Sequence, residues 1–470
     1  MVVNHMVGAE VRERLGKVID ENWHSKHNYT KPSSSHYPDL FLWDSCSAAI
    51  INSRRGKPEV AARELRTVLQ GIDPTTGFIP NRRILGKPNL KDLEAFFTFT
   101  KRSQSNYTQP PLMAHSTWEI YEGFMKKGEG EKGKAFLKEV YGENKPNEAS
   151  GLKGSYGYFK RFRENGNGSK LLLVVTPKET GRDSDRSLLK GAVRIPTRGL
   201  IARLIPAGKE IIPLANTVLN TITHFKINLD AKKNNWEVEK SRYRVNDVMF
   251  NVLYVDNLRY MAKIGNELGN KEEGRSYENL AREMEEEILS KMWNEDDGFF
   301  YNLDKDGKQI KIASISGLFP LLLNNISEYQ LRGLLDKLES LDWFNTPYPI
   351  PSVPVNSPHH DASHKEKSLW SQGEVYMITN FHLLRGIVKQ VERFKTNENL
   401  LSRLLPILNR VTSSSESLLE KSGLREFYSS LTGKGYRVKN FTWSGHALHF
   451  DKSNLSLNQF GKNQEELGVS

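Results

Sequence analysis

Apolar side chains recur every three or four residues along much of the chain, which is the spacing of one face of an α-helix. The pattern is clearest in four stretches, at 61–69, 258–268, 277–292 and 377–388. Gly269 closes the second stretch, and glycine is the residue that most often ends a helix. The chain is therefore predicted to consist mainly of amphipathic helices.

Segments with strand character are few and short. The clearest are KLLLVV at 170–175 and GFFYNL at 298–303. Neither begins an alternating series of helices and strands, so a doubly wound sheet is not expected. The apolar segment 198–214 is interrupted by Pro206 and Pro213, and we predict a short helix followed by a loop there.

Turn-rich clusters separate the predicted helices, but no long Pro-, Gly- or Ser-rich linker divides the chain. Linkers of that kind usually mark domain boundaries. We therefore predict one all-α domain over residues 1–470, with helical hairpins packed in sequence. Residues 452–470 are polar and are predicted to form a fraying C-terminal tail.

The charge of the chain does not indicate a nucleic-acid partner. Its net charge is +11, but the 67 Lys and Arg residues are interspersed with 56 Asp and Glu residues. A solvated surface has that pattern, whereas nucleic-acid binding is signalled by dense basic blocks, zinc-finger spacing or an RNP-like run. No nucleic-acid partner is therefore predicted, and the sequence makes no prediction of an oligomeric state.

A cytoplasmic location is predicted from three features of the sequence. No apolar run approaches the roughly 18 residues that cross a bilayer, so no membrane partner is expected. The first residues lack the apolar segment of a signal peptide. Cys46 is the single cysteine, which excludes an intrachain disulfide, and we predict a small buried residue there.

Acidic and aromatic residues gather in the loops between the predicted helices. Aromatic faces stack on sugar rings, while carboxylates and amides accept hydrogen bonds from sugar hydroxyls, so such loops are suited to a carbohydrate cleft. The residues concerned are Trp43, Asp44, Gln109, Glu179, Asp183, Asp185, Trp370, Gln372, Glu374, Glu426, Tyr428 and Trp443.

Structural roles also fit single members of this set. Asp44 precedes a helical run and could be its N-cap. Tryptophan beside a helix is commonly a core residue, and Glu374 could stabilise the first turn of a helix. At this level a carbohydrate cleft and these structural roles both remain open.

Motifs for other chemistries are incomplete. The DKDG segment at 304–307 lacks the later ligands of a calcium loop and is interpreted as a turn. The histidines at 359–360 and 446–449 lack third and fourth ligands at a familiar spacing, so no metal and no cofactor are predicted. The nucleophile elbow of an α/β-hydrolase is also absent.

Taken together and in order, the segments resemble glycoside hydrolase family 63, in its bacterial and archaeal branch of mannosylglycerate and glucosylglycerate hydrolases. The resemblance runs from about residue 39 to 450. Each segment alone is only moderately specific for the family. Seven such segments in the same order as in the family make the resemblance specific. The segments are LWDSCSAAI (42–50), YTQPPLMAHSTWEIYE (107–122), VTPKETGRDSDRS (175–187), RYRVNDVMFNVLYVDNLRYMAKIGNELG (242–269), MWNEDDGFFYNLD (292–304), PSVPVNSP (351–358) with SQGEVYMITNFHLLRGI (371–387), and LREFYSSLTGKGYRVKNFTWSGHAL (424–448).

The resemblance implies an (α/α)6 toroid with long loops at one mouth and an inverting α-glycosidase that uses two carboxylates. By position, Asp183 matches the general acid and Glu426 the general base. In such enzymes the two groups lie roughly 6.5–9.5 Å apart, which leaves room for a water molecule. Asp44 matches the residue that holds sugar hydroxyls.

The remaining candidate residues bind the substrate in this interpretation. Trp43, Gln109 and Trp443 match cleft-lining positions of the family. Trp370, Gln372 and Tyr428 lie in the same candidate loops and are included as substrate-binding residues. The predicted partner is thus a small carbohydrate, namely an α-glucoside or α-mannoside such as a glyceryl glycoside or short oligosaccharide.

The sequence departs from the family pattern in three places. Asp183 is followed by Ser-Asp-Arg where the family has Asn-Ser-Pro, and Gln372-Gly-Glu stands where it has Arg-Gly-Pro. Tyr428-Ser-Ser replaces Tyr-Asn-Pro. Because both proposed catalytic carboxylates are kept, we expect an effect on leaving-group specificity first. A sugar-binding toroid without hydrolysis, and a phosphorylase or epimerase on the same fold, are the alternative functions.

Overall fold

The computed structural model describes residues 8–86, 103–142, 144–145, 148–165, 168–189, 223, 226–361 and 371–450. Three predictions lie outside these residues. They are the short helix at 198–214, the substrate-binding residue Trp370 and the polar tail at 452–470.

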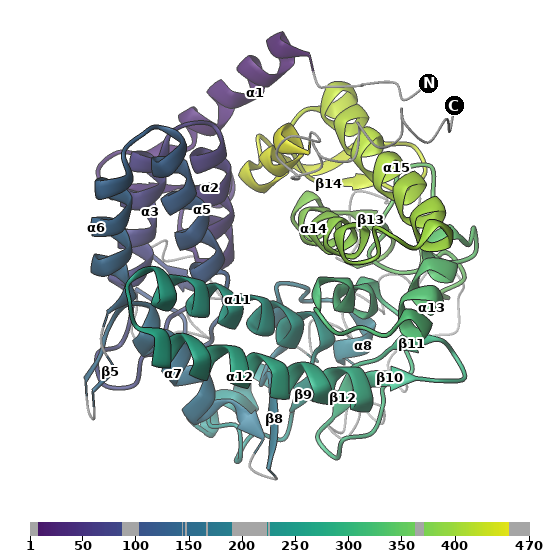
Figure 1. Cartoon of the computed structure of the whole chain (residues 1–470), viewed down its shortest axis with the longest axis horizontal. Coiled ribbons are helices and arrows are strands. Elements are labelled where there is room, and N and C mark those ends of the chain that lie inside the picture. Colours follow the sequence, from purple (N-terminus) through teal and green to yellow (C-terminus); the bar gives the residue numbers. More distant parts are fainter. Residues whose placement is uncertain are drawn as a thin grey trace, which may run out of the picture.

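Within the described residues, six helical elements form a closed inner ring (Figure 1). Each element packs against the next, and the last packs against the first, which closes the ring. In order, they are α2 (Leu42–Arg54), α5 (Met113–Lys126), α11 (Val248–Glu267), the 3-10 helix η4 (Ile315–Leu322), α14 (Met377–Arg393) and the 3-10 helix η5 (Thr442–His449).

Further helices cover this ring from outside. Each packs against an inner element or against another outer helix. They are α1 (Ala9–Glu21), α3 (Pro58–Leu69), α6 (Gly130–Tyr141), α12 (Lys271–Glu287), α13 (Glu328–Glu339) and α15 (Glu398–Ser422). This arrangement of described elements is an (α/α)6 toroid, so the predicted fold class is confirmed.

Burial explains which helix belongs to which layer. In α2 every residue from Leu42 to Ser53 is buried, because this helix has neighbours on all sides. In α12 the buried residues are confined to Gly274, Ala281, Met284 and Glu285, which form one stripe. A helix that is apolar all round belongs inside, and a helix with one apolar stripe belongs at the surface.

The four predicted helical stretches are confirmed, in α3, α11, α12 and α14. The third stretch ends in the π-helical turn η3 (Ile288–Met292). Four shorter or peripheral helical elements complete the described set: α7 (Gly151–Phe162), η1 (Pro177–Thr180), α8 (Arg186–Leu189) and a helical run at 226–233.

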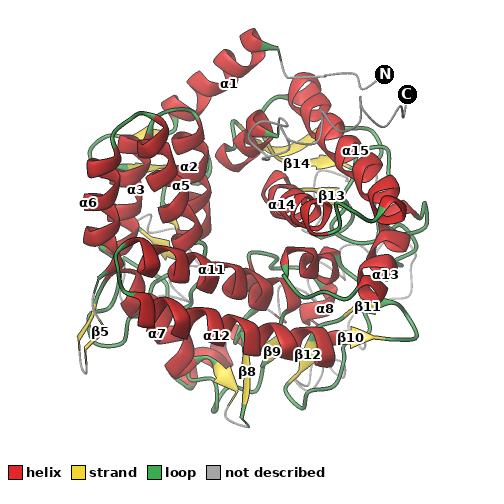
Figure 2. Cartoon of the chain, in the orientation of Figure 1, coloured by secondary structure: helices red, strands yellow, loops and turns green. Residues whose placement is uncertain are grey.

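Strands are short and lie between the helices (Figure 2). The two predicted strand segments are confirmed, although 298–303 splits into two strands. The strands that pair two by two are β1 (Trp23–His24) with β2 (Tyr29–Thr30), β3 (Leu40–Phe41) with β4 (Arg82–Arg83), β5 (Asn144–Lys145) with β6 (Glu148–Ala149), β7 (Glu164–Asn165) with β8 (Ser169–Leu172), β9 (Val245–Asn246) with β12 (Leu303–Asp304), and β10 (Trp293–Asn294) with β11 (Phe299–Phe300).

One three-stranded sheet contradicts a prediction. The segment around 424–448 was expected to be a loop, but it contains the antiparallel strands β14 (Arg425–Ser429) and β15 (Gly435–Lys439). Strand β13 (Glu374–Val375) pairs with β14 on its other side. Long-range pairing of this kind is not encoded in the local pattern of either segment, so sequence periodicity alone did not reveal it.

None of the helices in the described part of the chain is long and apolar enough to cross a membrane. Cys46 is buried in α2, as predicted for a small core residue.

Candidate active site

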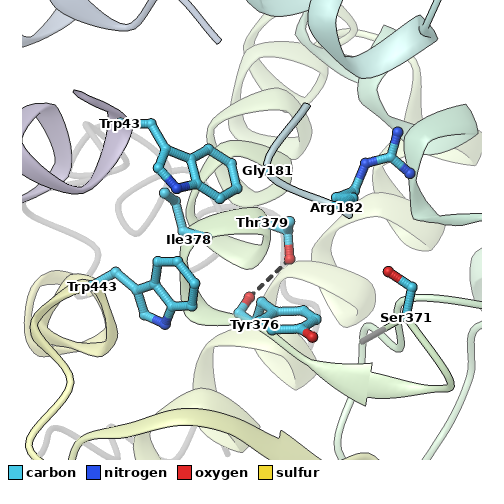
Figure 3. A pocket seen from close by; sticks show the side chains of 8 residues that line it. All are labelled: Trp43, Gly181, Arg182, Ser371, Tyr376, Ile378, Thr379 and Trp443. Carbon is cyan, nitrogen blue, oxygen red and sulfur yellow. Dashed lines mark hydrogen bonds between the residues drawn. The ribbon is translucent and has the colours of Figure 1, made fainter. Parts of the chain in front are cut away.

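A pocket lies where several inner elements begin (Figure 3). Trp43 is the second residue of α2, Trp443 is the second residue of η5, and Tyr376 is the N-cap of α14. The indoles of Trp43 and Trp443 meet edge to face with their ring centroids 5.8 Å apart. The ring of Tyr376 meets Trp443 in the same manner at 6.1 Å. The lining residues are Trp43, Gly181, Arg182, Ser371, Tyr376, Ile378, Thr379 and Trp443.

Gly181 allows the loop of Asp183 to lie directly against Trp43. Its φ angle of +71° falls in the left-handed region, which residues with a Cβ rarely adopt. A Cβ at this position would stand 2.4 Å from the Trp43 ring. The loop therefore reaches the pocket wall only because residue 181 is glycine.

Arg182 anchors the same loop from the opposite side. Its guanidinium pairs with both Asp185 and Asp247, and it also donates to Ser314 Oγ at 3.2 Å. Figure 3 shows this guanidinium directed away from the two indoles. Asp247 is the N-cap of α11, where its carboxylate accepts the Phe250 N–H, so the loop is tied to an inner helix.

The three acidic side chains of the 176–185 segment differ in their surroundings. Asp185 pairs with Arg182 and also accepts the Ser187 N–H at 2.8 Å. Glu179 is buried against Arg163 at 2.5 Å and accepts the Val175 N–H. Asp183, in contrast, is partly exposed. Of the three residues, Asp183 is thus the one that solvent reaches.

Glu426 lies on β14 with its side chain fully buried. Its Oε1 atom accepts the Tyr37 hydroxyl at 3.3 Å and lies 3.6 Å from Arg437 Nη1. Its Oε2 atom accepts the Val438 N–H at 3.4 Å. Burial raises the pKa of Glu426 above its ordinary value, although Arg437, Val438 and Tyr37 each lower it.

Tyr37 donates a hydrogen bond to Glu426, the proposed base, and sequence analysis did not single it out. Burial raises the pKa of its hydroxyl most, and the charges of Glu426 and Asp183 raise it further. Its ring is held edge to face by Phe41 and Phe441. An aromatic residue in the turn just before the first family-like segment was the available signal.

Asp44 lies inside the first turn of α2, so the N-cap interpretation of this residue is wrong. The N-cap is Phe41, whose side chain makes no capping hydrogen bond. Burial raises the pKa of Asp44 to about 8, and the charge of Glu426 contributes to that shift. Gln109 is buried nearby, and its Oε1 atom accepts the Trp43 N–H at 3.1 Å. Asp44, Trp43 and Gln109 therefore lie together at the start of α2.

Glu374 belongs to β13 and not to a first helical turn, so that interpretation is also wrong. Its buried carboxylate accepts the N–H of Gln372 at 2.5 Å and the Tyr376 hydroxyl at 2.6 Å. It also accepts the Ser371 N–H and the Ser352 hydroxyl. The carboxylate thus holds the loop of Gln372 beside the pocket.

Tyr428 and Trp443 flank Glu426 differently. Tyr428 is fully buried, and its hydroxyl donates at 2.7 Å to the carbonyl oxygen of Gly423, the C-cap of α15 just before its own strand. Trp443 lines the pocket, and its Nε1 donates to Glu426 O at 2.9 Å. Trp443 therefore links the pocket wall to the strand of Glu426, whereas Tyr428 supports that strand from within.

No group of three or more His, Cys, Asp or Glu residues that could hold a metal ion occurs among the described residues. His446, one of the histidines considered from sequence, is buried, shares a hydrogen bond of 2.5 Å with Ser47 and stacks on Phe381.

We expect Arg182→Met to destabilise the protein by about 3–5 kcal/mol, because Asp185 and Asp247 would lose their buried partner. Urea denaturation followed by circular dichroism measures this free energy. Arg186→Met, at a partly exposed arginine of the same segment, should cost less than about 1 kcal/mol. Equal losses in the two variants would contradict the anchoring role of Arg182.

We expect Asp44→Asn to raise the melting temperature relative to wild type more at pH 9 than at pH 5. The folded-state pKa of Asp44, about 8, exceeds the unfolded value of 3.8. The stability that this group contributes is therefore complete below pH 4 and is lost as pH rises through about 8. Differential scanning calorimetry across this range measures the difference.

Asp20→Asn is the control for this pH series. Burial would raise the pKa of Asp20, but hydrogen bonds from Arg55 and Lys57 lower it overall. The loss of stability in this variant should stay constant from pH 5 to 9. A pH-independent difference for Asp44→Asn as well would show that Asp44 has no raised pKa.

Comparisons with known proteins show the family of this chain. The model of the family described as "Mannosylglycerate hydrolase MGH1-like glycoside hydrolase domain" matches residues 37–444. A mannosylglycerate hydrolase from Rubrobacter radiotolerans is 24% identical, covering 94% of this chain and 97% of that protein. An uncharacterized protein from Borreliella burgdorferi is 32% identical over 138 residues, which are 29% of this chain and 28% of that protein.

Solved structures show the same fold. The family 63 mannosylglycerate hydrolase from Thermus thermophilus, in complex with Tris and D-glycerate, matches with a TM-score of 0.73 at 21% identity. The match covers 93% of this chain and 99% of that one. A second structure of that enzyme, in complex with glucose, has a TM-score of 0.71 at 19% identity, and covers 95% and 99%. This chain therefore belongs to the mannosylglycerate hydrolase MGH1-like family and is a glycoside hydrolase.

Proposed function

We propose that this protein hydrolyses a small α-mannoside or α-glucoside with inversion at the anomeric carbon. Asp183 gives its proton to the glycosidic oxygen as the bond from that oxygen to the anomeric carbon breaks. Glu426 takes a proton from a water molecule, whose oxygen bonds to the anomeric carbon from the opposite face. The products are the free sugar of inverted configuration and the aglycone alcohol.

The buried carboxylate of Glu426, held by Tyr37 and Arg437 on a strand that Trp443 ties to the pocket wall, is the observation that carries this proposal. The Tyr37 hydroxyl donates to Glu426, and the charge of Asp183 acts on the same hydroxyl. Asp183 comes from a loop and Glu426 from a strand, and the charges of both act to raise the pKa of the Tyr37 hydroxyl. A pair of carboxylates on opposite sides of a substrate is the requirement of the inverting reaction.

The surroundings of Glu426 suit a general base. Burial keeps its pKa above the ordinary glutamate value, which strengthens it as a base. The hydrogen bond from Tyr37 and the charge of Arg437 limit that rise, so the carboxylate can still be ionised when substrate binds. A pKa close to the working pH is the most effective for proton transfer.

Aromatic and carboxylic groups of the kind that bind a sugar lie in and around the pocket, which holds about 10 Å³ and has to widen to admit a sugar ring. The rings of Trp43, Trp443 and Tyr376 supply aromatic surface. Asp44, when protonated, can donate to a hydroxyl oxygen, and when ionised it accepts from a hydroxyl. Since the curated relatives are mannosylglycerate hydrolases, mannosylglycerate is the first substrate to test, followed by glucosylglycerate and short α-glucans.

Turnover with inversion is the expected result for the wild-type protein. Proton NMR of the reaction, recorded before mutarotation, should show the β-anomer of the released sugar. Asp183→Asn and Glu426→Gln should each lower kcat by about 100- to 10,000-fold, because each removes a proton-transfer group. Asp296→Asn, at an exposed aspartate of the 294–298 turn, should leave kcat unchanged.

Several outcomes would contradict the proposal. Release of the α-anomer would indicate retention. Unchanged kcat in both carboxylate variants would place the chemistry elsewhere. Binding of these glycosides by calorimetry without any turnover would select the alternative of a sugar-binding toroid, and a requirement for inorganic phosphate would indicate a phosphorylase.

Tyr37→Phe should move the acidic limb of the kcat/KM profile to higher pH. The hydroxyl lowers the pKa of Glu426 by hydrogen bonding, so its loss raises the pH at which the proposed base becomes ionised. Initial rates from pH 4 to 9 measure this limb.

Tyr29→Phe is the matched control for Tyr37→Phe. The Tyr29 hydroxyl donates to Pro38 O at 2.5 Å and thus supports the loop of Tyr37 without touching Glu426. This variant should keep the position of the acidic limb. Identical profiles for both variants would assign Tyr37 a purely structural role.

A further inference from the structure

We propose that a second groove, on the periphery of the ring, binds a neutral oligosaccharide. It lies between the 73–78 loop, the end of α7 and the 232–239 segment, and we call it the outer groove. It encloses about 590 Å³, a volume within the range of small-molecule sites. It shares no lining residue with the pocket of Trp43 and Trp443. The proposal is independent of the proposed catalytic function.

Three aromatic rings form a continuous wall of the outer groove. Phe78 meets Tyr158 edge to face with centroids 5.4 Å apart, and Tyr158 lies 5.4 Å from Phe162. Phe162 is 46% exposed, which is unusual for such a large apolar side chain at a helix end. The exposed ring of Phe162, backed by the other two rings, offers stacking surface to a sugar ring. The volume of the outer groove is also large enough for more than one sugar unit.

Trp236 brings an indole N–H donor to the outer groove, and its backbone has an unusual positive φ angle. Asn235 and Trp236 both have φ angles near +60°, at 54° and 60°. Two consecutive non-glycine residues in this region cost free energy, and such outliers persist mainly where a position has a function. The Trp236 Nε1 atom is buried and has no hydrogen-bond partner among the described residues. A bound sugar hydroxyl would supply the missing acceptor once the indole turns this N–H toward the groove.

The charges of the outer groove favour a neutral ligand over an anionic one. Four carboxylates line it, against the two cations Arg161 and Lys232. The carboxylates are Asp73, Glu164, Glu237 and Glu239. An anionic glyceryl glycoside would be repelled by this excess of negative charge, whereas neutral hydroxyls can donate to the carboxylates. Asn106 adds an amide to the same wall.

The groove is also held in shape before a ligand arrives. Asp73 accepts the N–H groups of Thr75 and Thr76 through one oxygen, which fixes the 73–78 loop. Arg161 donates to Thr76 O at 2.8 Å and so ties that loop to α7. A preformed wall lowers the ordering cost of binding.

Isothermal titration calorimetry of the full chain with maltotetraose tests the proposal. The protein carries Asp183→Asn so that hydrolysis does not disturb the measurement. Phe162→Ala in this background should weaken maltotetraose binding about tenfold, because the exposed ring of the wall is lost. Trp236→Phe keeps a ring, removes only the donor and should weaken binding by a smaller factor.

Controls separate this site from the catalytic pocket. Leu341→Ala, at an apolar residue that is 75% exposed elsewhere, should leave maltotetraose binding unchanged. In the wild-type background, Phe162→Ala should leave the kcat/KM for mannosylglycerate or any other cleaved glycoside unchanged. If no glycoside is cleaved, the calorimetric comparison still decides the proposal.

Three results would overturn the proposal of an oligosaccharide site. The first is the absence of maltotetraose binding, and the second is maltotetraose binding that neither Phe162→Ala nor Trp236→Phe weakens. The third is binding of pentalysine in place of maltotetraose, which would make the groove a site for basic peptides. Thermal melting of each variant verifies that it is folded before titration.

Discussion

The ion cluster of Arg182 is the interaction on which the site depends. A buried guanidinium is costly unless carboxylates surround it, and here Asp185 and Asp247 do so. Asp247 belongs to the start of α11, while Arg182 and Asp185 belong to the loop of the proposed acid. The cluster therefore fixes the loop to the inner ring. Gly181 completes the arrangement, because it lets the anchored loop lie against Trp43.

Similar pairs join the inner helices away from the pocket. Arg54 of α2 pairs with Glu119 of α5 at 2.6 Å, and Arg385 of α14 pairs with Asp256 of α11 at 2.9 Å. Each pair connects two helices that are far apart in sequence. Because removal of one partner would leave a buried charge, these pairs penalise any other arrangement of the helices. The ring is thus specified by charges as well as by apolar packing.

The apolar spacing in α3, α11, α12 and α14 predicted a helical domain, and the resemblance to family 63 supplied the toroid. The inner helix α2 showed no such stripe, because it is buried all round. The sheet of β13, β14 and β15 was missed because its strands are brought together only by closure of the ring.

For the site, the structure brings Trp43, Asp44 and Gln109 together at the start of α2 and places Trp443 in the same pocket as Trp43, while their role in substrate binding stays a prediction. Tyr37 was missed, because a single tyrosine between Ser-rich and Pro-containing residues has no pattern of its own. Its importance comes from its contact with Glu426, which is 389 residues away in sequence. Contacts at such separation follow from the tertiary structure and not from local sequence.

The departures from the family pattern acquire a physical meaning in this structure. Asp185, in the altered stretch after Asp183, binds Arg182, and Glu374, in the altered stretch after Gln372, binds the backbone of its own loop. The carboxylates of Asp185 and Glu374 thus both make contacts that hold their loops in place. They add no exposed negative charge to the pocket, although the arginine of the family is absent there. The altered residues therefore change how the two loops are supported.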